Sequence, residues 1–218
     1  MSRTGAENNC RTLFGIRTVH LSKSYGDETV IRDLSAEFLC GGRYCLMSPS
    51  GTGKTTFFRL LMGLEKPDSG QISFPVREGN SSGVTRYPSR PRFSAVFQED
   101  RLLEGYTLLE NIRFVTGRRM PADLIRETAL RLLPEDSLEK PVSEYSGGMR
   151  RRAAILRSLL APSDILLMDE PFSGLDPDSR QAAASVICEL LRDRLLLVST
   201  HNEEDHLLLG AGIFRLRP

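Results

Sequence analysis

Short apolar runs alternate with amphipathic segments along most of the chain. Residues 165–168 and 195–199 are almost entirely apolar, which is typical of parallel strands buried on both faces. Apolar residues at three- and four-residue spacing predict helices over 107–133 and 177–192, and another helix is predicted after Ser146. Further strands are predicted at 16–22, 29–38, 43–47, 71–74 and 94–98, with a last edge strand at 212–217. Strands that alternate with helices in this way predict an α/β fold.

The pattern predicts a single domain that follows a polar tail. We expect residues 1–15 to form a loose N-terminal tail and residues 16–218 to form the domain, with a helical insertion at about 100–150. Residues 75–92 are rich in Gly, Ser, Pro and Arg, which predicts a surface excursion.

Composition excludes several classes of protein. The chain has 218 residues, of which 40% are hydrophobic and 26% charged, as in an ordinary globular protein. Its net charge of +1 gives no overall attraction to nucleic acid. The four cysteines form no C-x-x-C pair. The N-terminus lacks the apolar core of a secretory signal, and no apolar run reaches the ~20 residues that span a bilayer. We therefore expect a cytoplasmic protein.

A candidate phosphate-binding loop lies between a predicted strand and a predicted helix. Residues 46–56 read L-M-S-P-S-G-T-G-K-T-T, and glycines in such a loop let backbone N–H groups surround phosphate oxygens. Lys54 is expected to reach the β- and γ-phosphates of ATP, and the Thr55 hydroxyl to ligate Mg²⁺. The predicted nucleotide contacts come from Ser48, Pro49, Ser50, Gly51, Thr52, Gly53, Lys54, Thr55 and Thr56.

Ser48 departs from the G-x-x-x-x-G-K-[ST] pattern, which has glycine at that position. Serine tolerates a positive φ poorly, which counts against the motif. The alternative is a Ser/Gly-rich turn that precedes a helix by chance. Because the inner residues of the loop are intact, we predict that nucleotide still binds.

Two carboxylates, Asp169 and Glu170, end the apolar run at 165–168. Ligands of open α/β sheets bind at the carboxyl ends of strands, so Asp169 is predicted to lie near Mg²⁺ and Glu170 to orient or deprotonate the attacking water. The alternative is a solvated acidic turn.

The segment Y-S-G-G-M-R, residues 145–150, resembles the signature motif of ABC ATPases, which is usually L-S-G-G-Q. The order of motifs over residues 16–218 is similar to that family as well. The resemblance implies a phosphate-loop NTPase fold of the ABC type, with a mixed or parallel core sheet, an antiparallel β subdomain and a helical subdomain. It also implies ATP hydrolysis that is coupled to transport.

Several site residues follow from the resemblance alone. Tyr25 is similar to the aromatic residue that stacks on adenine, although a half-buried core tyrosine is the alternative. Gln98 resembles the glutamine that touches Mg²⁺ and the attacking water, and His201 resembles the histidine that contacts the γ-phosphate. Asp176 belongs to a segment similar to the D-loop at the dimer interface; it also fits the N-cap of a helix that starts at Pro177. The resemblance gives Ser146, Gly147 and Gly148 to the ATP site of a second subunit.

The resemblance also implies partners. A second ATPase subunit would form a homodimer with ATP, and transmembrane permease subunits would dock at about 100–145, with a substrate-binding protein acting through the permease. The F-Q-E-D-R-L-L segment, residues 97–103, is similar to importer ATPases for nitrate, sulfonate and taurine, so we expect an importer subunit on the inner face of the membrane. Two alternatives stay open: an ATPase of a lipoprotein-release or cell-division machine, and a pseudo-ATPase that only binds nucleotide. The run 150–152 is expected to be a solvated arginine face that binds no nucleic acid.

Overall fold

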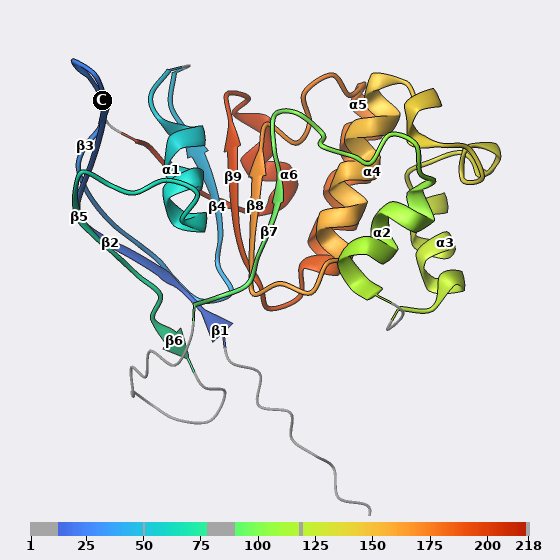
Figure 1. The fold of residues 1–218 in the computed structure, drawn as a ribbon, viewed down its shortest axis with the longest axis horizontal. Coiled ribbons are helices and arrows are strands. Elements are labelled where there is room, and N and C mark those ends of the chain that lie inside the picture. Colours follow the sequence, from blue (N-terminus) through green and yellow to red (C-terminus); the bar gives the residue numbers. More distant parts are fainter. Residues whose placement is uncertain (1–12, 50, 78–89, 118–119, 217–218) are drawn as a thin grey trace, which may run out of the picture.

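The centre of the molecule is a five-stranded parallel sheet in the order β10-β4-β9-β8-β7 (Figure 1). The computed structural model describes residues 13–49, 51–77, 90–117 and 120–216. The strands of this sheet are β4 (Arg43–Met47), β7 (Phe93–Val96), β8 (Ile165–Asp169), β9 (Leu195–Thr200) and β10 (Gly212–Phe214). The predicted strands at 43–47, 165–168 and 195–199 are confirmed, and the last strand lies at the edge as expected.

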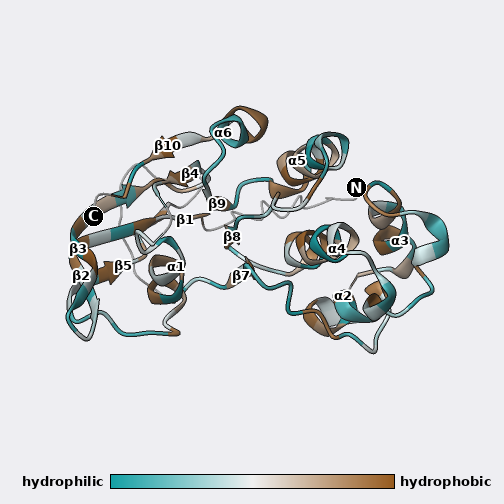
Figure 2. Ribbon diagram, turned by 90° about the horizontal axis from the view of Figure 1, so that it is seen from above, coloured by the Kyte–Doolittle hydropathy of each residue, from teal (hydrophilic) through white to brown (hydrophobic). Residues whose placement is uncertain are grey.

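Both faces of this sheet are covered, which explains why its central strands are continuously apolar. Alternate residues of β8 and β9 belong to different hydrophobic cores: Leu167 and Leu197 face α1 (Lys54–Met62), whereas Leu166 and Leu196 face α4 (Gly147–Leu160) and α5 (Pro177–Leu191). Figure 2 shows α1 on one side of the strands, with α5 and α6 (Glu204–Leu209) on the other. Burial on both faces is the environment in which parallel sheets occur.

An antiparallel sheet packs beside α1. It has the order β3-β2-β5, formed by β2 (Ile16–Tyr25), β3 (Glu28–Phe38) and β5 (Ser69–Ser73). A two-stranded ladder joins β1 (Leu13–Phe14) to β6 (Val76–Arg77). The predicted tail is therefore wrong for residues 13–15, because Phe14 is buried and Gly15 N–H donates to Pro75 O at 2.8 Å. The fold class predicted from the sequence is confirmed.

The helical insertion lies between β7 and β8 and forms a lobe beside the sheet (Figure 1). The helical pattern predicted over 107–133 is confirmed, and it forms two helices, α2 (Leu108–Thr116) and α3 (Ala122–Leu130). Gly117 ends α2 with φ of 64°, and Pro121 precedes α3. Two short 3-10 turns, η2 (Glu135–Ser137) and η3 (Val142–Glu144), lead to α4, which packs on α2 and α5. Among the described residues, no helix has the length and apolar character needed to cross a bilayer.

Candidate nucleotide-binding site

Four parallel strands end at the same edge of the central sheet. Strand β4 leads into the phosphate loop, β7 into Gln98, β8 into Glu170 and β9 into His201. The structure therefore brings together residues that lie far apart in the sequence, as strand ends in a parallel sheet require. A cleft of about 290 Å³ opens at this edge. It is lined by Val30, Gly51, Gly53, Lys54, Thr55, Thr56, Gln98, Asp169 and Glu170.

The phosphate loop has the conformation that its glycines allow. Gly53 has φ of 82° and caps α1, and a Cβ there would lie 2.8 Å from both Val30 Cγ1 and Val30 O. No side chain caps the first turn of α1, so its backbone N–H groups can receive an anion at the cleft. The buried Lys54 Nζ donates to Ser48 O at 2.5 Å and to Pro49 O at 3.0 Å. An ammonium has three donors, so one remains for a phosphate oxygen. Ser50, which was also predicted to contact nucleotide, lies outside the described residues.

Ser48 fits the loop without the strain that its departure from the motif suggested. Among the described residues, five non-glycine residues have positive φ, and Ser48 is not one of them. Its hydroxyl lies 2.6 Å from Met47 O and 2.8 Å from Leu216 O, so one proton can serve either acceptor. The serine thus links the loop to the last described segment.

Asp169 organises the hydroxyl that was predicted to ligate Mg²⁺. Thr55 Oγ1 donates to Asp169 Oδ2 at 2.6 Å, and Ser199 Oγ donates to Asp169 Oδ1. Because the Thr55 proton points to the carboxylate, the oxygen lone pairs remain for a metal ion. Among the described residues, no cluster of three or more His, Cys, Asp or Glu side chains is arranged to hold a metal. The oxygen donors of Thr55 and Asp169 are of the kind that hard cations such as Mg²⁺ bind. Sequence reasoning missed Ser199, which looked like an ordinary strand residue.

Glu170 has an uncommon backbone conformation and one close partner. Its φ is 49°, in the left-handed region that residues with a Cβ rarely adopt, and its N–H donates to Ser199 O at 3.0 Å. Its carboxylate Oε2 lies 3.0 Å from Nδ1 of His201, whose side chain is mostly exposed. Strained residues of this kind concentrate at functional sites. The two predicted catalytic side chains are thus neighbours at the cleft.

Gln98 lies at the cleft. Two arginine side chains of α4 donate hydrogen bonds to backbone carbonyls of the segment that contains it. Arg151 donates from Nη1 to Phe97 O at 2.7 Å and from Nη2 to Gln98 O at 2.6 Å. Arg157 donates in the same way to Arg101 O at 2.8 Å and Asp100 O at 3.2 Å.

The predicted solvated arginine face is therefore wrong. Arg151 is buried, and both its Nη atoms bind carbonyls. Its Nη1 also lies 3.2 Å from Asp100 Oδ1. Arg150 and Arg152 are half-buried; Arg152 donates to Ser179 Oγ at 2.8 Å. The run of arginines in the sequence does not indicate that Arg151 is buried, because the carbonyls that Arg151 binds lie about fifty residues away.

The signature segment begins α4 but lies outside the cleft. Ser146 is the N-cap, and its Oγ accepts from Met149 N–H at 3.3 Å. Tyr145 is buried and donates to Ser137 O at 2.9 Å. A Cβ on Gly147 would have no heavy atom within 4 Å, so the space above it is open. Within the described part of the chain, the residues that line the cleft do not include Ser146, Gly147 or Gly148.

Within the described part of the chain, Asp176 and Tyr25 lie outside the residues that line the cleft. Asp176 is the N-cap of α5 and accepts from Ser179 N–H at 2.9 Å, which confirms the capping interpretation. This hydrogen bond, followed by that of the Ser179 hydroxyl, lowers the pKa of Asp176. Tyr25 is 46% exposed, and it stays a candidate for stacking on adenine. Its hydroxyl donates to Glu65, and Lys23 Nζ lies over its ring, 5.4 Å from the centroid.

The comparison with protein families agrees with this geometry. The sequence model described as ABC transporter matches residues 31–173 of the chain. The chain belongs to the ABC transporter family. It is an ABC ATPase subunit, and this family hydrolyses ATP to power transport. The pseudo-ATPase alternative loses its support, since that support was Ser48, whose φ is not positive, and the family hydrolyses ATP.

Named relatives of this ABC ATPase include importers and exporters. An aliphatic sulfonates import ATP-binding protein from Rhodococcus jostii is 37% identical over 94% of this chain and 80% of that protein. A Nod factor export ATP-binding protein I from Ralstonia nicotianae is 36% identical over 85% of this chain, which spans 59% of that relative's length. The structure of a dimeric bacterial ABC transporter cassette has a TM-score of 0.74 at 22% identity, covering 92% of this chain and 94% of that one, which shows the fold.

Proposed function

We propose that this ABC ATPase binds ATP and Mg²⁺ in the cleft at the carboxyl edge of its parallel sheet. The main support is the convergence there of Lys54, Thr55, Gln98 and Glu170 from two strand ends and one helix N-terminus. Lys54 and the N–H groups of α1 bind the β- and γ-phosphates, and Tyr25 stacks on adenine. Mg²⁺, held by the Thr55 hydroxyl with Gln98 and Asp169 nearby, neutralises phosphate charge. Glu170 orients or deprotonates the attacking water, and His201 contacts the γ-phosphate.

Two copies of the chain close head to tail over two ATP molecules in this proposal. One cleft supplies only part of the donors that a triphosphate needs, and the Ser146–Gly148 turn of the same chain is not among them. That turn has an open surface at Gly147 and a helix N-terminus, which favours an anion brought by a second copy. The D-loop passes close to the signature turn, because a Cβ on Gly148 would lie 3.6 Å from Leu175 Cδ2 and 3.7 Å from Gly174 O.

The variant Glu170→Gln tests this dimer. It keeps the size of the side chain and removes its charge, so we expect ATP binding, stalled hydrolysis and a stable dimer on sizing chromatography with saturating Mg²⁺-ATP. Gly147→Trp added to this variant is the matched control. The open space at Gly147 accepts the ring within one copy but obstructs a second copy, so it should bind ATP as a monomer. If Glu170→Gln alone stays monomeric with ATP bound, the head-to-tail arrangement is refuted.

A permease docks on the helical lobe in this proposal, which places the subunit on the inner face of the membrane. A groove of about 350 Å³ lies next to the segment that carries Gln98, and its lining includes Arg101, Leu102 and Glu104. Tyr106 and Phe114 are exposed nearby, with ring centroids 5.4 Å apart. The variant Phe114→Glu should abolish co-purification with permease subunits from membranes while the purified ATPase keeps its basal turnover. Unchanged co-purification would contradict this docking face.

We propose import as the direction of transport, with a substrate-binding protein acting through the permease. The support is the sulfonate import relative, which the chain matches over more of its length than the Nod factor export relative. Identifying the permease that co-purifies tests this assignment. An exporter permease, or a lipoprotein-release or cell-division partner, would overturn it.

A further inference from the structure

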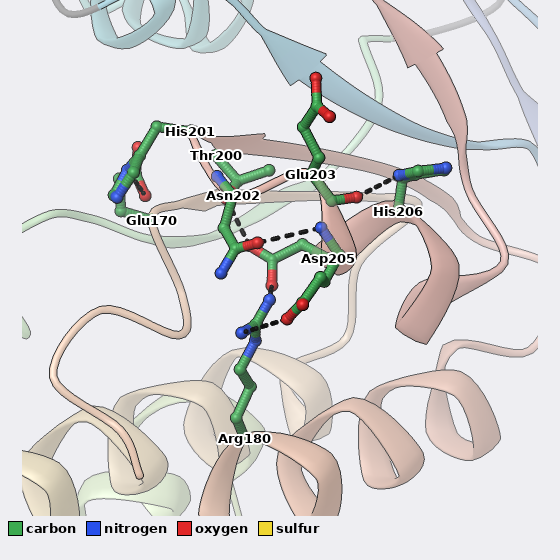
Figure 3. A network of polar contacts seen from close by, with 9 residues as sticks. Glu170, Arg180, Thr200, His201, Asn202, Glu203, Asp205 and His206 are labelled. Carbon is green, nitrogen blue, oxygen red and sulfur yellow. Dashed lines mark hydrogen bonds and ion pairs between the residues drawn. The ribbon is translucent and has the colours of Figure 1, made fainter. Parts of the chain in front are cut away.

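A buried ion pair lies beneath the loop that carries His201. Asp205, in the first turn of α6, is 2% exposed, and its Oδ1 accepts from Arg180 Nε at 2.9 Å and Nη2 at 2.5 Å. Arg180 extends from α5 to reach it, as Figure 3 shows. Because two nitrogens of Arg180 donate to the buried carboxylate, the relative orientation of the two side chains is fixed. Exposed ion pairs between flexible side chains are not restricted in this way.

The same carboxylate fixes the backbone on both sides of His201. Thr200 Oγ1 donates to Asp205 Oδ2 and accepts from Asn202 N–H at 3.1 Å. Asn202 Oδ1 in turn accepts from Glu204 N–H at 2.9 Å. His201 lies between these anchored residues, with its side chain 73% exposed and Nδ1 3.0 Å from Glu170. The histidine thus has an anchored backbone and a side chain with one polar contact (Figure 3).

The other partner of the pair belongs to the helix that starts at the D-loop. Arg180 N–H donates to Asp176 O at 2.9 Å in the first turn of α5. Its Nη1 also lies 3.3 Å from Glu204 Oε2, so the guanidinium contacts two residues of α6. Arg180 therefore joins the D-loop turn, through its backbone N–H, to Glu204 and Asp205 of α6, through its side chain.

We propose that the Arg180–Asp205 pair is a positioning device for ATP hydrolysis that holds the His201 loop and the D-loop helix in one fixed relation. Among the described residues, the cleft lining includes Glu170 but not Arg180, Asp205 or His201. His201 Nδ1 lies 3.0 Å from Glu170 Oε2, so the pair acts on the cleft through His201. When a second copy presses on the D-loop, α5 carries the change through Arg180 to the backbone at Thr200. The proposal rests on the role given to His201 above.

A double-mutant cycle tests the proposal in the purified chain. Asp205→Asn keeps the shape of the side chain and removes the charge, and we expect kcat to fall about tenfold with KM for ATP changed less than about twofold. In a His201→Ala background the same substitution should change kcat less than about twofold, because the group it positions is gone. A positioning residue that acts through His201 requires this loss of effect, whereas a purely structural residue would lower kcat in both backgrounds.

Asp164→Asn is the matched control. Asp164 accepts from Arg92 N–H at 2.8 Å and Nη2 at 3.3 Å at the opposite edge of the same sheet. The variant Asp164→Asn should lower the melting temperature without lowering kcat. If Asp205→Asn does not fold, Arg180→Lys, which keeps the charge and loses the paired donors, takes its place in the cycle.

The outcomes separate the two proposals. An equal loss of kcat in both backgrounds, or an equal loss in Asp164→Asn, overturns the positioning role while leaving His201 in its place. A wild-type kcat in His201→Ala alone refutes the role of His201 and the inference with it.

Discussion

Replacing Ser48 with glycine is expected to destabilise the protein without improving nucleotide binding. Glycine is the residue that the phosphate-loop pattern has at this position, so the sequence alone suggests the opposite. In the structure the φ of Ser48 is not positive, and glycine's freedom has no use there. The substitution removes the hydroxyl that lies 2.8 Å from Leu216 O.

The magnitude has two parts. A hydrogen bond of this kind contributes a net ~0.5–1.5 kcal/mol to the free energy of unfolding. Glycine adds ~0.4–1 kcal/mol by increasing the backbone freedom of the unfolded chain. Together they amount to ~1–2.5 kcal/mol. At ~2–4 °C per kcal/mol for a domain of this size, the melting temperature should fall by ~2–10 °C.

Thermal unfolding and ATP titration calorimetry measure the two effects. Ser48→Ala is the matched control, because it loses the hydrogen bond and keeps the Cβ; its loss of stability should be smaller than that of glycine. Lys54 Nζ binds the Ser48 carbonyl, which belongs to the backbone, so neither variant should change the Kd for ATP by more than about twofold. If Ser48→Gly binds ATP several times more tightly at an unchanged melting temperature, our interpretation of this position is wrong.

Three further predictions concern the loop contacts, the strained glutamate and pH. Arg151→Met leaves two carbonyls without their donors and should cost ~2–4 kcal/mol in denaturant unfolding, with Arg151→Lys costing less because one donor remains. Glu170→Gly should abolish ATP turnover yet raise the melting temperature above that of Glu170→Ala, because only glycine relieves the strain of a φ of 49°. For pH, a hydrogen bond from Lys23 lowers the pKa of Asp68, and the same bond raises the pKa of Lys23. The stability from Asp68 is present above its unfolded pKa of ~3.9 and is lost as pH falls through its folded pKa; that from Lys23 is lost as pH rises through its own. The difference in melting temperature between wild type and Asp68→Asn should therefore be largest near neutrality and vanish in acid; a constant difference across pH would contradict this.

The sequence predicts the elements of this fold that are determined by residues close together in the chain. Continuous apolar runs identify β8 and β9, and the loop between β4 and α1 carries its own turn chemistry. The helix break at Gly117 was missed because apolar spacing continues on both sides of it. The extent of the tail was wrong because the pairing of Phe14 with Val76 is a contact between distant segments.

The candidate site divides in the same way. The residues that we propose to contact a phosphate or a water sit in short motifs, which can be found in the sequence. The residues that hold those motifs in place do not belong to short motifs, so the sequence did not indicate them. Arg151 looked like a surface arginine, and Asp205 had no signal at all, because each works through atoms that only the folded chain brings near. Motif reasoning finds the groups that meet a ligand and misses the groups that orient them.

The arginine contacts on segment 97–101 have a mechanical consequence. The guanidinium groups of Arg151 and Arg157 hold four consecutive or near-consecutive carbonyls of that segment, and both arginines belong to α4. A protein that binds segment 97–101 would therefore act on α4, whose N-cap is Ser146.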